Sequence, residues 1–247
     1  RLVREHRLSR ADLIWALVIH DGDEKEVPVA ALPGVSRLSV RGGAQAAKRA
    51  VSLGIPAVAI FPHIDGSKKD AAGRAALNPD GLVCTAVRAM KYAAPELGLM
   101  VDVALAPFTD HGHDGLLREG RILNDETVKV LAEQALVQVH AGADIVAPSD
   151  MMDGRVGAIR AALDANGHQD AMIMSYAAKF ASAFYGPYRE AIGSAAALKG
   201  DKRTYQMDFA NADESLREVA MDVAEGADML LVKPGLAYLD VVARVKS

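Results

Sequence analysis

One pattern, repeated four times, constrains this chain more than any other feature. An alanine-rich amphipathic stretch ends at a glycine, and an apolar run follows at once. The four repeats are "AAKRAVSLG" before "IPAVAIFPH", "AVRAMKYAAPELG" before "LMVDVALAP", "VKVLAEQALVQVHAG" before "ADIVAPSD" and "LREVAMDVAEG" before "ADMLLVKP". Apolar runs that do not alternate with polar residues are typical of strands buried on both faces. Helices that alternate with such strands indicate a parallel α/β architecture.

Six core strands are predicted, over residues 13–19, 57–61, 100–106, 144–148, 171–176 and 228–233. The glycines expected to end helices in the left-handed conformation are Gly54, Gly98, Gly142 and Gly226. Polar residues cluster after the strands, which is where a (β/α)8 barrel places its active site. No G-x-G-x-x-G follows the first strand, so a dinucleotide-binding open sheet is disfavoured. The prediction is an α/β protein, a (β/α)8 TIM barrel with about six βα units in this chain.

The domain organisation follows from that count. Residues 1–247 are expected to form a single barrel domain that is incomplete at the C-terminus, with residues 1–10 as the remnant of an N-terminal arm. With about two units absent, the first and sixth strands should face an open slot. Unpaired strand edges invite association. We therefore expect this chain on its own to be loosely packed and prone to aggregate.

Composition narrows the possible partners. The chain is 51% hydrophobic with a formal net charge of −4, which gives no reason to expect nucleic acid or a membrane surface as partner. No apolar run reaches the roughly 18 residues of a membrane span, and "RLVREHRLSRADL" lacks the apolar core of a secretory signal. Cys84 is the single cysteine, which excludes an intramolecular disulfide. We expect Cys84 to be a packing residue and the location to be cytoplasmic or an organelle stroma.

Two lysines stand at the ends of apolar runs that are predicted to be buried strands. The run "AMIMSYAAK" ends at Lys179 and "ADMLLVK" ends at Lys233. A lysine amine attacks a ketone only when neutral, and its ordinary pKa is near 10.4. Desolvation or a neighbouring cation lowers that pKa and activates the amine for Schiff-base formation. The alternative is that each lysine extends along apolar surface to reach solvent. The presence of two at strand ends, both beside proline-containing turns, favours chemistry.

Other polar residues gather after the predicted strands. Asp102 interrupts an apolar strand, and a buried carboxylate needs a partner, so we expect a strand-end lysine beside it. Ser149 is expected to face the barrel mouth, while Asp153 either does the same or caps the following helix. The stretch "DHGHDG" is either a divalent metal site or a glycine-rich loop that collects such residues. The four side chains in question are Asp110, His111, His113 and Asp114.

A long basic excursion, "YGPYREAIGSAAALKGDKRTYQMD", follows the fifth strand. Arg189, Lys202 and Arg203 are candidates for binding a substrate carboxylate, with surface solvation as the alternative. Long glycine-containing excursions over a barrel mouth often act as lids.

The chain resembles the 5-aminolevulinate dehydratase family, also called porphobilinogen synthases. The resemblance rests on "LPGVSRLS", "HGHDG", "APSDMMDGRV", "MSYAAKFASAFYGPYREA", "TYQMD" and "LLVKP", which run in the family's order over residues 32 to 234. It implies a barrel that condenses two molecules of 5-aminolevulinate to porphobilinogen in tetrapyrrole (haem and chlorophyll) biosynthesis. Lys233 would hold the first substrate and Lys179 the second, each as a Schiff base. The resemblance also implies a homo-oligomer, an octamer or a hexamer. The implied catalytic and substrate-binding residues are Lys233, Lys179, Asp102, Ser149, Arg189, Lys202, Arg203, Gln206, Tyr176 and Phe184.

The resemblance also implies which metal ions the protein can bind. Zinc-dependent members have three cysteines, at the positions of Ala104, Ala106 and Asp114 here. Only Asp114 offers a ligand, so we expect no active-site metal and no organic cofactor. A regulatory magnesium near Glu218 and Asp153 is a further expectation.

Two rival functions stay open. One is a class I aldolase-type barrel that uses a single lysine, in which Lys179 is dispensable. The other is a shortened, non-catalytic form that acts only in assembly with intact subunits. Porphobilinogen formation by the chain excludes the non-catalytic form. The aldolase-type barrel predicts instead that Lys179→Ala retains turnover and that only Lys233 is trapped by borohydride.

Overall fold

A computed structural model describes residues 2–194 and 197–247. Six strands form the core of its main sheet, each running parallel to its neighbours in chain order. They are β1 (Ile14–His20), β4 (Ala57–His63), β5 (Gly98–Val103), β8 (Ile145–Pro148), β9 (Met172–Lys179) and β10 (Met229–Lys233). All six core strands predicted from the sequence are confirmed. The third ends earlier than expected, because the chain turns after Val103.

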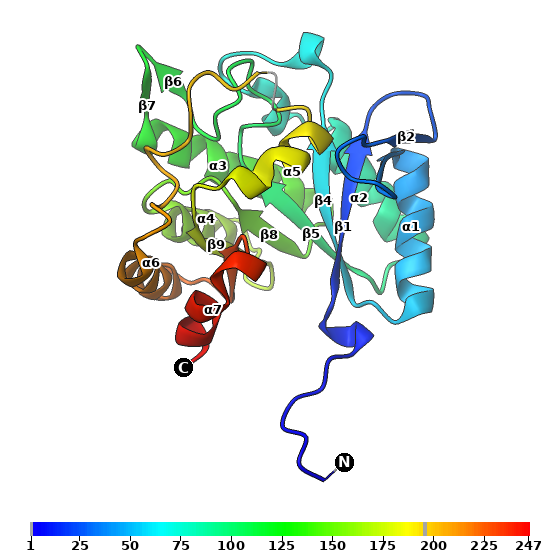
Figure 1. The fold of residues 1–247 in the computed structure, drawn as a ribbon. Coiled ribbons are helices and arrows are strands. Elements are labelled where there is room, and N and C mark those ends of the chain that lie inside the picture. Colours follow the sequence, from blue (N-terminus) through cyan, green and yellow to red (C-terminus); the bar gives the residue numbers. More distant parts are fainter. Residues whose placement is uncertain (1, 195–196) are drawn as a thin grey trace.

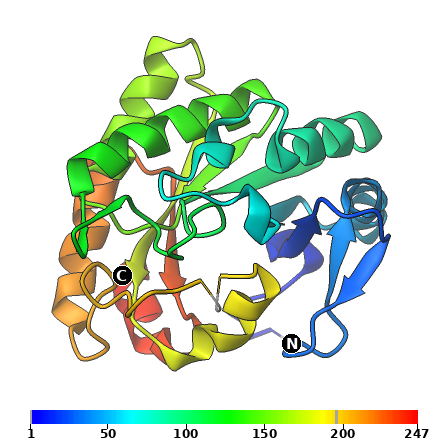
Figure 2. The ribbon, with the colours of Figure 1, turned by 90° about the horizontal axis from the view of Figure 1, so that it is seen from above.

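Helices cover the outside of the curved sheet (Figure 2). They are α1 (Val40–Leu53), α2 (Leu82–Ala93), α3 (Asn124–His140), α4 (Arg155–Ala165) and α6 (Ala212–Ala224). Helix α5 (Gly186–Ala191) lies across the carboxyl ends of the strands, whereas α7 (Leu239–Lys246) closes the described chain beside α6 (Figure 1). The alternation of strands and helices is the parallel α/β arrangement that the repeated pattern predicts.

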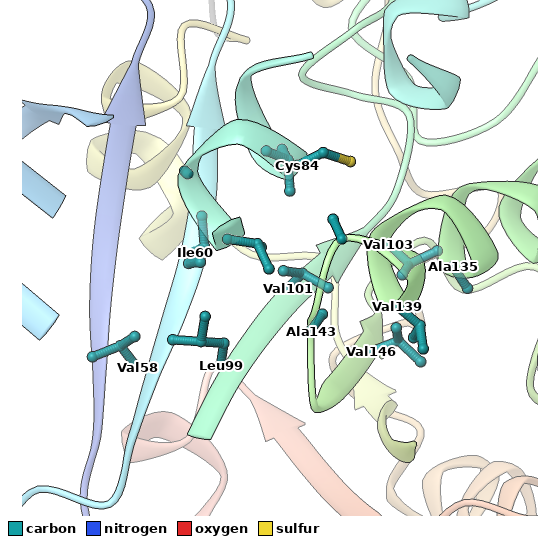
Figure 3. Close-up of a cluster of buried hydrophobic side chains, with 14 of the residues drawn as sticks. Val58, Ile60, Cys84, Leu99, Val101, Val103, Ala135, Val139, Ala143 and Val146 are labelled. Carbon is teal, nitrogen blue, oxygen red and sulfur yellow. The ribbon is translucent and has the colours of Figure 1, made fainter. Parts of the chain in front are cut away.

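Apolar side chains fill the sheet on both faces. Residues such as Val58, Leu99 and Val146 pack outward against the helices (Figure 3), while Phe61, Met100 and Tyr176 pack on the inner face. Burial on both faces explains why the strands read as continuous apolar runs. Cys84 lies in the outer layer with a 2% exposed side chain, which confirms it as a packing residue (Figure 3).

Most helix ends follow the predicted glycines. Gly54, Gly142 and Gly226 have φ of 72°, 110° and 103°, a region that favours glycine. The prediction for Gly98 is wrong, because this residue begins β5. Helix α2 has already ended at Ala93, two residues before Pro95. A proline disfavours the helical conformation for the residue that precedes it, here Ala94.

A Gly-Ala-Asp sequence precedes two of the strands and fixes their register. The Asp144 carboxylate accepts a hydrogen bond from the Leu99 N–H of the preceding strand at 2.7 Å. Asp228 does the same for the Ile173 N–H, also at 2.7 Å. Each aspartate therefore holds the amino end of its own strand against the neighbouring strand.

Two short strands beside β1 and a separate hairpin were not predicted. Strand β3 (Ser36–Ser39) pairs parallel with β1 opposite Val18 to His20, and β2 (Glu26–Pro28) pairs antiparallel with β3. The outer edge of β1 is therefore covered at its carboxyl end, which corrects for Val18 to His20 the expectation that the first strand faces an open slot. Within the described residues, β10 pairs only with β9. A separate hairpin joins β6 (Leu117–Arg118) to β7 (Arg121–Ile122).

The first described residues, 2–9, are exposed and run away from the barrel (Figure 1). No helix in the described part of the chain is long and apolar enough to cross a membrane.

Candidate active site

The two lysines singled out in the sequence lie side by side. Lys179 is the last residue of β9, Lys233 is the last residue of β10, and the two are register partners across these parallel strands. Neighbouring strands are about 4.8 Å apart. Both side chains line one small cavity at the carboxyl end of the sheet. The fold thus brings together two amines that are separated by more than fifty residues in sequence.

Three tyrosine rings surround the Lys233 ammonium. Its Nζ lies 4.2 Å from the ring centre of Tyr188, 5.3 Å from that of Tyr176 and 5.5 Å from that of Tyr185. The Tyr185 hydroxyl is 2.7 Å from the Phe180 carbonyl and 2.9 Å from the Lys233 carbonyl, which fixes the end of β10. Of these three, only Tyr176 is among the predicted site residues, although Tyr185 and Tyr188 stand in "FYGPYR", which follows Lys179 closely.

The surroundings of Lys233 favour its neutral form. Burial is the largest influence, the charge of Lys179 is the next, and together they lower the pKa of Lys233 to about 8. The carboxylates of Asp102 and Asp114 oppose this shift. An amine with a pKa near 8 is about one-tenth neutral at pH 7, compared with less than a thousandth for an ordinary lysine.

Lys179 contacts the end of the neighbouring strand. Its 7% exposed side chain donates a hydrogen bond to the Ser149 carbonyl, and the Ser149 N–H donates to the Val103 carbonyl at 3.1 Å. Ser149 lines the same cavity as Lys179 and Lys233, so it faces the barrel mouth as expected.

Asp102 also lines this cavity and is 5% exposed. Burial raises its pKa, while Ser149 and the charges of Lys179 and Lys233 act in the opposite direction. The expectation that a strand-end lysine pairs with Asp102 is only partly met. Both lysines are near enough to influence it, but among the described residues Asp102 forms no ion pair, and its Oδ1 has no hydrogen-bond partner.

Residues 197–206 form a segment across the cavity, which we call the lid segment. Its Lys202 ammonium is 2.8 Å from the Asp114 carboxylate in a buried ion pair. Burial acts to raise the pKa of Asp114, but the charges of Lys202 and Lys179 and the hydrogen bond from Lys202 together lower it. Gln206 is buried beside them, whereas the Arg203 side chain is 81% exposed.

Two cavities meet at the lid segment. The inner one, which contains both lysines, has a volume of about 20 Å³, close to that of one water molecule. The outer one has a volume of about 400 Å³. Arg189, Lys202 and Gln206 line both, and Arg203 lines the outer one. Phe184, in contrast, is 73% exposed beside Pro234 and Leu236, and the structure does not bring it to the lysines.

The histidines of "HGHDG" face hydrogen-bond partners. His111 Nε2 is 3.2 Å from the Ala71 carbonyl, and His113 contacts the Tyr205 hydroxyl and the Lys199 carbonyl. Across residues 2–194 and 197–247, no three His, Cys, Asp or Glu side chains are grouped so as to hold a metal. Both ring nitrogens of each histidine are engaged within the protein, which favours the second interpretation of this stretch, a loop.

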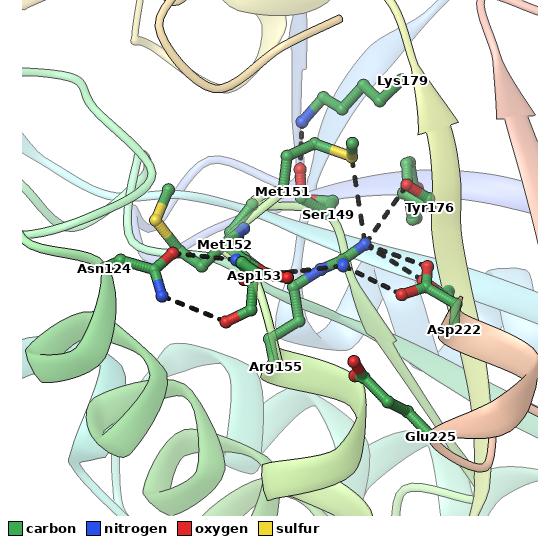
Figure 4. A network of polar contacts seen from close by, with 12 residues as sticks. Asn124, Ser149, Met151, Met152, Asp153, Arg155, Tyr176, Lys179, Asp222 and Glu225 are labelled. Atoms are coloured by element: carbon green, nitrogen blue, oxygen red, sulfur yellow. Dashed lines mark hydrogen bonds and ion pairs between the residues drawn. The ribbon is translucent and has the colours of Figure 1, made fainter. Parts of the chain in front are cut away.

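A buried ionic network lies behind Lys179 (Figure 4). Arg155 donates to the Asp222 carboxylate of α6 at 3.2 Å and to the Ser175 hydroxyl of β9 at 3.1 Å. Its Nε is 3.7 Å from the Asp150 carboxylate, and burial raises the pKa of Asp150 to about 6. The network therefore joins α4, α6, the end of β8 and the middle of β9. It could not be predicted from the sequence, since Asp222 lies far along the chain from Arg155.

Removing one member of this network should be costly. We expect Asp222→Ala to lower the free energy of unfolding by about 3–5 kcal/mol, because it leaves the Arg155 charge buried without its partner. Asp213→Ala is the matched control on the same helix, since its ion pair with Arg244 is exposed and should contribute about 0–1 kcal/mol. Urea unfolding measures both. Equal effects of the two variants would contradict this assignment.

Asp153 and Glu218 lie beside the network. Asp153 does not cap α4, so that alternative is wrong: Gly154 precedes the helix and no side chain caps it. The Asp153 N–H instead donates a hydrogen bond of 2.8 Å to the side-chain oxygen of Asn124 in α3 (Figure 4). Burial and then the Asp222 charge raise the pKa of Glu218, and Asp153 adds to the effect. Excess negative charge of this kind is compatible with a nearby cation.

The chain matches the family model described as delta-aminolevulinic acid dehydratase over residues 1–247. It is 62% identical over 246 residues to the delta-aminolevulinic acid dehydratase of Bradyrhizobium diazoefficiens, covering 100% of this chain and 70% of that protein. The Rhodobacter capsulatus protein of the same description is 51% identical over 245 residues, with coverage of 99% and 74%.

A solved structure agrees with these relatives. The Toxoplasma gondii delta-aminolevulinic acid dehydratase (porphobilinogen synthase), in complex with the reaction product porphobilinogen, superposes with a TM-score of 0.97 at 48% identity. The superposition covers 100% of this chain and 71% of that one, and it confirms the predicted fold class. With its motifs, its paired lysines and these relatives in agreement, the chain belongs to the delta-aminolevulinic acid dehydratase family.

Proposed function

We propose that this protein condenses two molecules of 5-aminolevulinate to porphobilinogen through Schiff bases on Lys233 and Lys179. Two buried amines on register-paired residues at one cavity support a reaction that holds two ketones side by side. The family and the relatives support the substrate and the product. Formation of the pyrrole from 5-aminolevulinate by the full-length protein, followed by mass spectrometry and NMR, tests the activity.

Lys233 reacts first. Its lowered pKa supplies the neutral amine that attacks the substrate ketone. The nitrogen bonds to the carbonyl carbon, loss of one water leaves a neutral imine, and uptake of one proton turns the imine into a cationic iminium. The three tyrosine faces surround that nitrogen at cation–π distances, so they stabilise its positive charge together with the carboxylates of Asp102 and Asp114.

Lys179 then holds the second ketone in the same way. Placing both substrates on adjacent strands turns a bimolecular condensation into an effectively intramolecular one, an advantage of up to about 7–11 kcal/mol. Asp102, with its raised pKa, lies where it can move protons between the two nitrogens, and the Ser149 carbonyl orients Lys179.

The remaining charged groups bind the substrate carboxylates. Arg189, Lys202 and Gln206 line the wall between the two cavities, where a carboxylate would find two cations and an amide donor. Arg203 lies farther out and serves as the first contact for an entering anion. Phe184 is assigned no contact with substrate, in view of its exposure.

The residues of this site do not match the metal ligands of the zinc-dependent enzymes. Ala104 and Ala106 present methyl groups, and the Asp114 carboxylate is paired with Lys202. Thiolate and imidazole are the ligands that zinc prefers. We therefore propose a catalytic site without a resident metal, and a regulatory magnesium held by Glu218 and Asp153, whose oxygen ligands suit that ion.

Chelation tests this proposal. We expect the full-length enzyme to retain at least half of its activity after exhaustive EDTA treatment, because the proposed steps use only protein groups. Any partial loss should be restored by magnesium and should disappear in Glu218→Gln. Loss of nearly all activity that zinc alone restores would contradict a metal-free catalytic site.

The assembly and the location remain predictions. A homo-oligomer, octamer or hexamer, can be tested by sedimentation of the full-length protein. A cytoplasmic location is predicted, although the relatives from Physcomitrium patens and Pisum sativum are described as chloroplastic.

A further inference from the structure

The "HGHDG" loop packs against the lid segment. His113 is 5% exposed, and each nitrogen of its ring faces a different residue of the lid segment. Nε2 lies 2.8 Å from the Lys199 carbonyl, and Nδ1 lies 3.0 Å from the Tyr205 hydroxyl. This imidazole takes no part in the proposed condensation.

The partners determine the tautomer of His113. A carbonyl can only accept, so Nε2 carries the proton and donates to Lys199. In the neutral ring Nδ1 is then an acceptor, and the Tyr205 hydroxyl donates to it. The same hydroxyl accepts from the Asp114 N–H at 3.3 Å. One donor and one acceptor of a neutral imidazole are thus both used on the lid segment.

Gly112 lets the two segments approach closely. A Cβ at this position would lie 2.8 Å from the backbone N and Cα of Leu198, and its φ of +72° already favours glycine. The Lys199 N–H donates to the His111 carbonyl at 3.1 Å. His111 is itself held by the Ala71 carbonyl, so the lid segment rests on a fixed loop.

These contacts lie on either side of Lys202. Lys199 precedes it, Tyr205 follows it, and its ammonium is paired with Asp114, the residue next to His113. With the lid segment in this position the lysine cavity has a volume of about 20 Å³, too small for a molecule of 5-aminolevulinate. The lid segment must therefore move outward to admit substrate, and the cavity must widen when the segment closes over the bound molecules.

We propose that His113 is a positioning residue that holds the lid segment closed over the two lysines, through one hydrogen bond donated to Lys199 and one accepted from Tyr205. The inference rests on the proposed function only in assigning substrate contacts to Lys202 and Gln206. His113 touches neither substrate, and it sets how often those residues are in place.

Three variants of the full-length enzyme test this role. His113→Leu keeps the side-chain bulk but removes donor and acceptor, and should raise KM for 5-aminolevulinate roughly 10-fold, the effect of losing two ordinary hydrogen bonds. Since these bonds form equally with bound substrate and in the transition state, kcat should change less than about 2-fold. His113→Gln supplies an amide donor and a carbonyl acceptor, and should stay within about 3-fold of the wild-type KM. Tyr205→Phe should raise KM by about 3-fold or more.

Hydrogen exchange provides a readout that does not depend on activity. The Lys199 amide should exchange roughly 10-fold faster in His113→Leu than in wild type, and near the wild-type rate in His113→Gln. A KM and an exchange rate unchanged in His113→Leu would overturn the proposal, as would a His113→Gln variant as impaired as His113→Leu. If the wild type forms no porphobilinogen but exchange responds as described, the proposed function fails while the lid contact stands.

Discussion

Replacing Lys233 by methionine is expected to reduce porphobilinogen formation by roughly 10⁴-fold or more, because no other group can form the first Schiff base. Methionine preserves most of the side-chain volume among Tyr176, Tyr185 and Tyr188, so the loss reports the amine rather than a cavity. The matched control is Lys246→Met on the exposed face of α7, which should leave kcat/KM unchanged.

The pH dependence of the first step adds a second test of Lys233. Only the neutral amine reacts, and burial together with the Lys179 charge places the pKa near 8. The rate of Schiff-base formation should therefore rise as the pH increases toward about 8 and level off above it. A rate that continues to rise to pH 10 would show that Lys233 has the pKa of an ordinary lysine, and would contradict the environment described for this residue.

Replacing Lys179 by methionine should lower turnover by roughly 10³-fold or more, while Lys233 still binds one substrate covalently. Lys179 supplies the second Schiff base and also a positive charge beside Lys233. Because that charge lowers the pKa of Lys233, its removal should move the midpoint for Schiff-base formation upward in pH.

This variant also separates the two catalytic alternatives. In a single-lysine aldolase-type mechanism, Lys179→Met would retain most of the turnover. Near-wild-type porphobilinogen formation by Lys179→Met would thus contradict the double Schiff base. A downward shift of the Lys233 midpoint would contradict the assigned interaction between the two ammonium groups.

The core strands could be predicted because burial on both faces determines their amino-acid composition. A strand covered by helices on one face and by a filled barrel on the other must be apolar throughout, and "AVAIFP" and "IVAP" show this. Strand β3 escaped detection because "SRLS" is short, polar and half-buried. It forms because Arg37 donates hydrogen bonds of 2.7 Å to the Glu190 and Ala191 carbonyls, more than 150 residues away.

The site shows the same division. Lys179 and Lys233 could be found from sequence because an ammonium at the end of an apolar run is conspicuous, and parallel strands place their carboxyl ends together. Their partners could not. From the sequence, Lys202 was expected only to bind a substrate carboxylate. In the structure it also pairs with Asp114, which lies 88 positions earlier. Phe184 stands among site residues in the sequence but follows Ser182 into an exposed turn.

Trapping of the Schiff bases tests the central claim most directly. The full-length protein would be incubated with 5-aminolevulinate, reduced with borohydride, digested and analysed by mass spectrometry. The added mass of one reduced substrate is expected on the peptide that contains Lys233, and at higher substrate concentration on the peptide that contains Lys179 as well. If neither lysine gains mass while porphobilinogen still forms, covalent catalysis by these two residues is wrong.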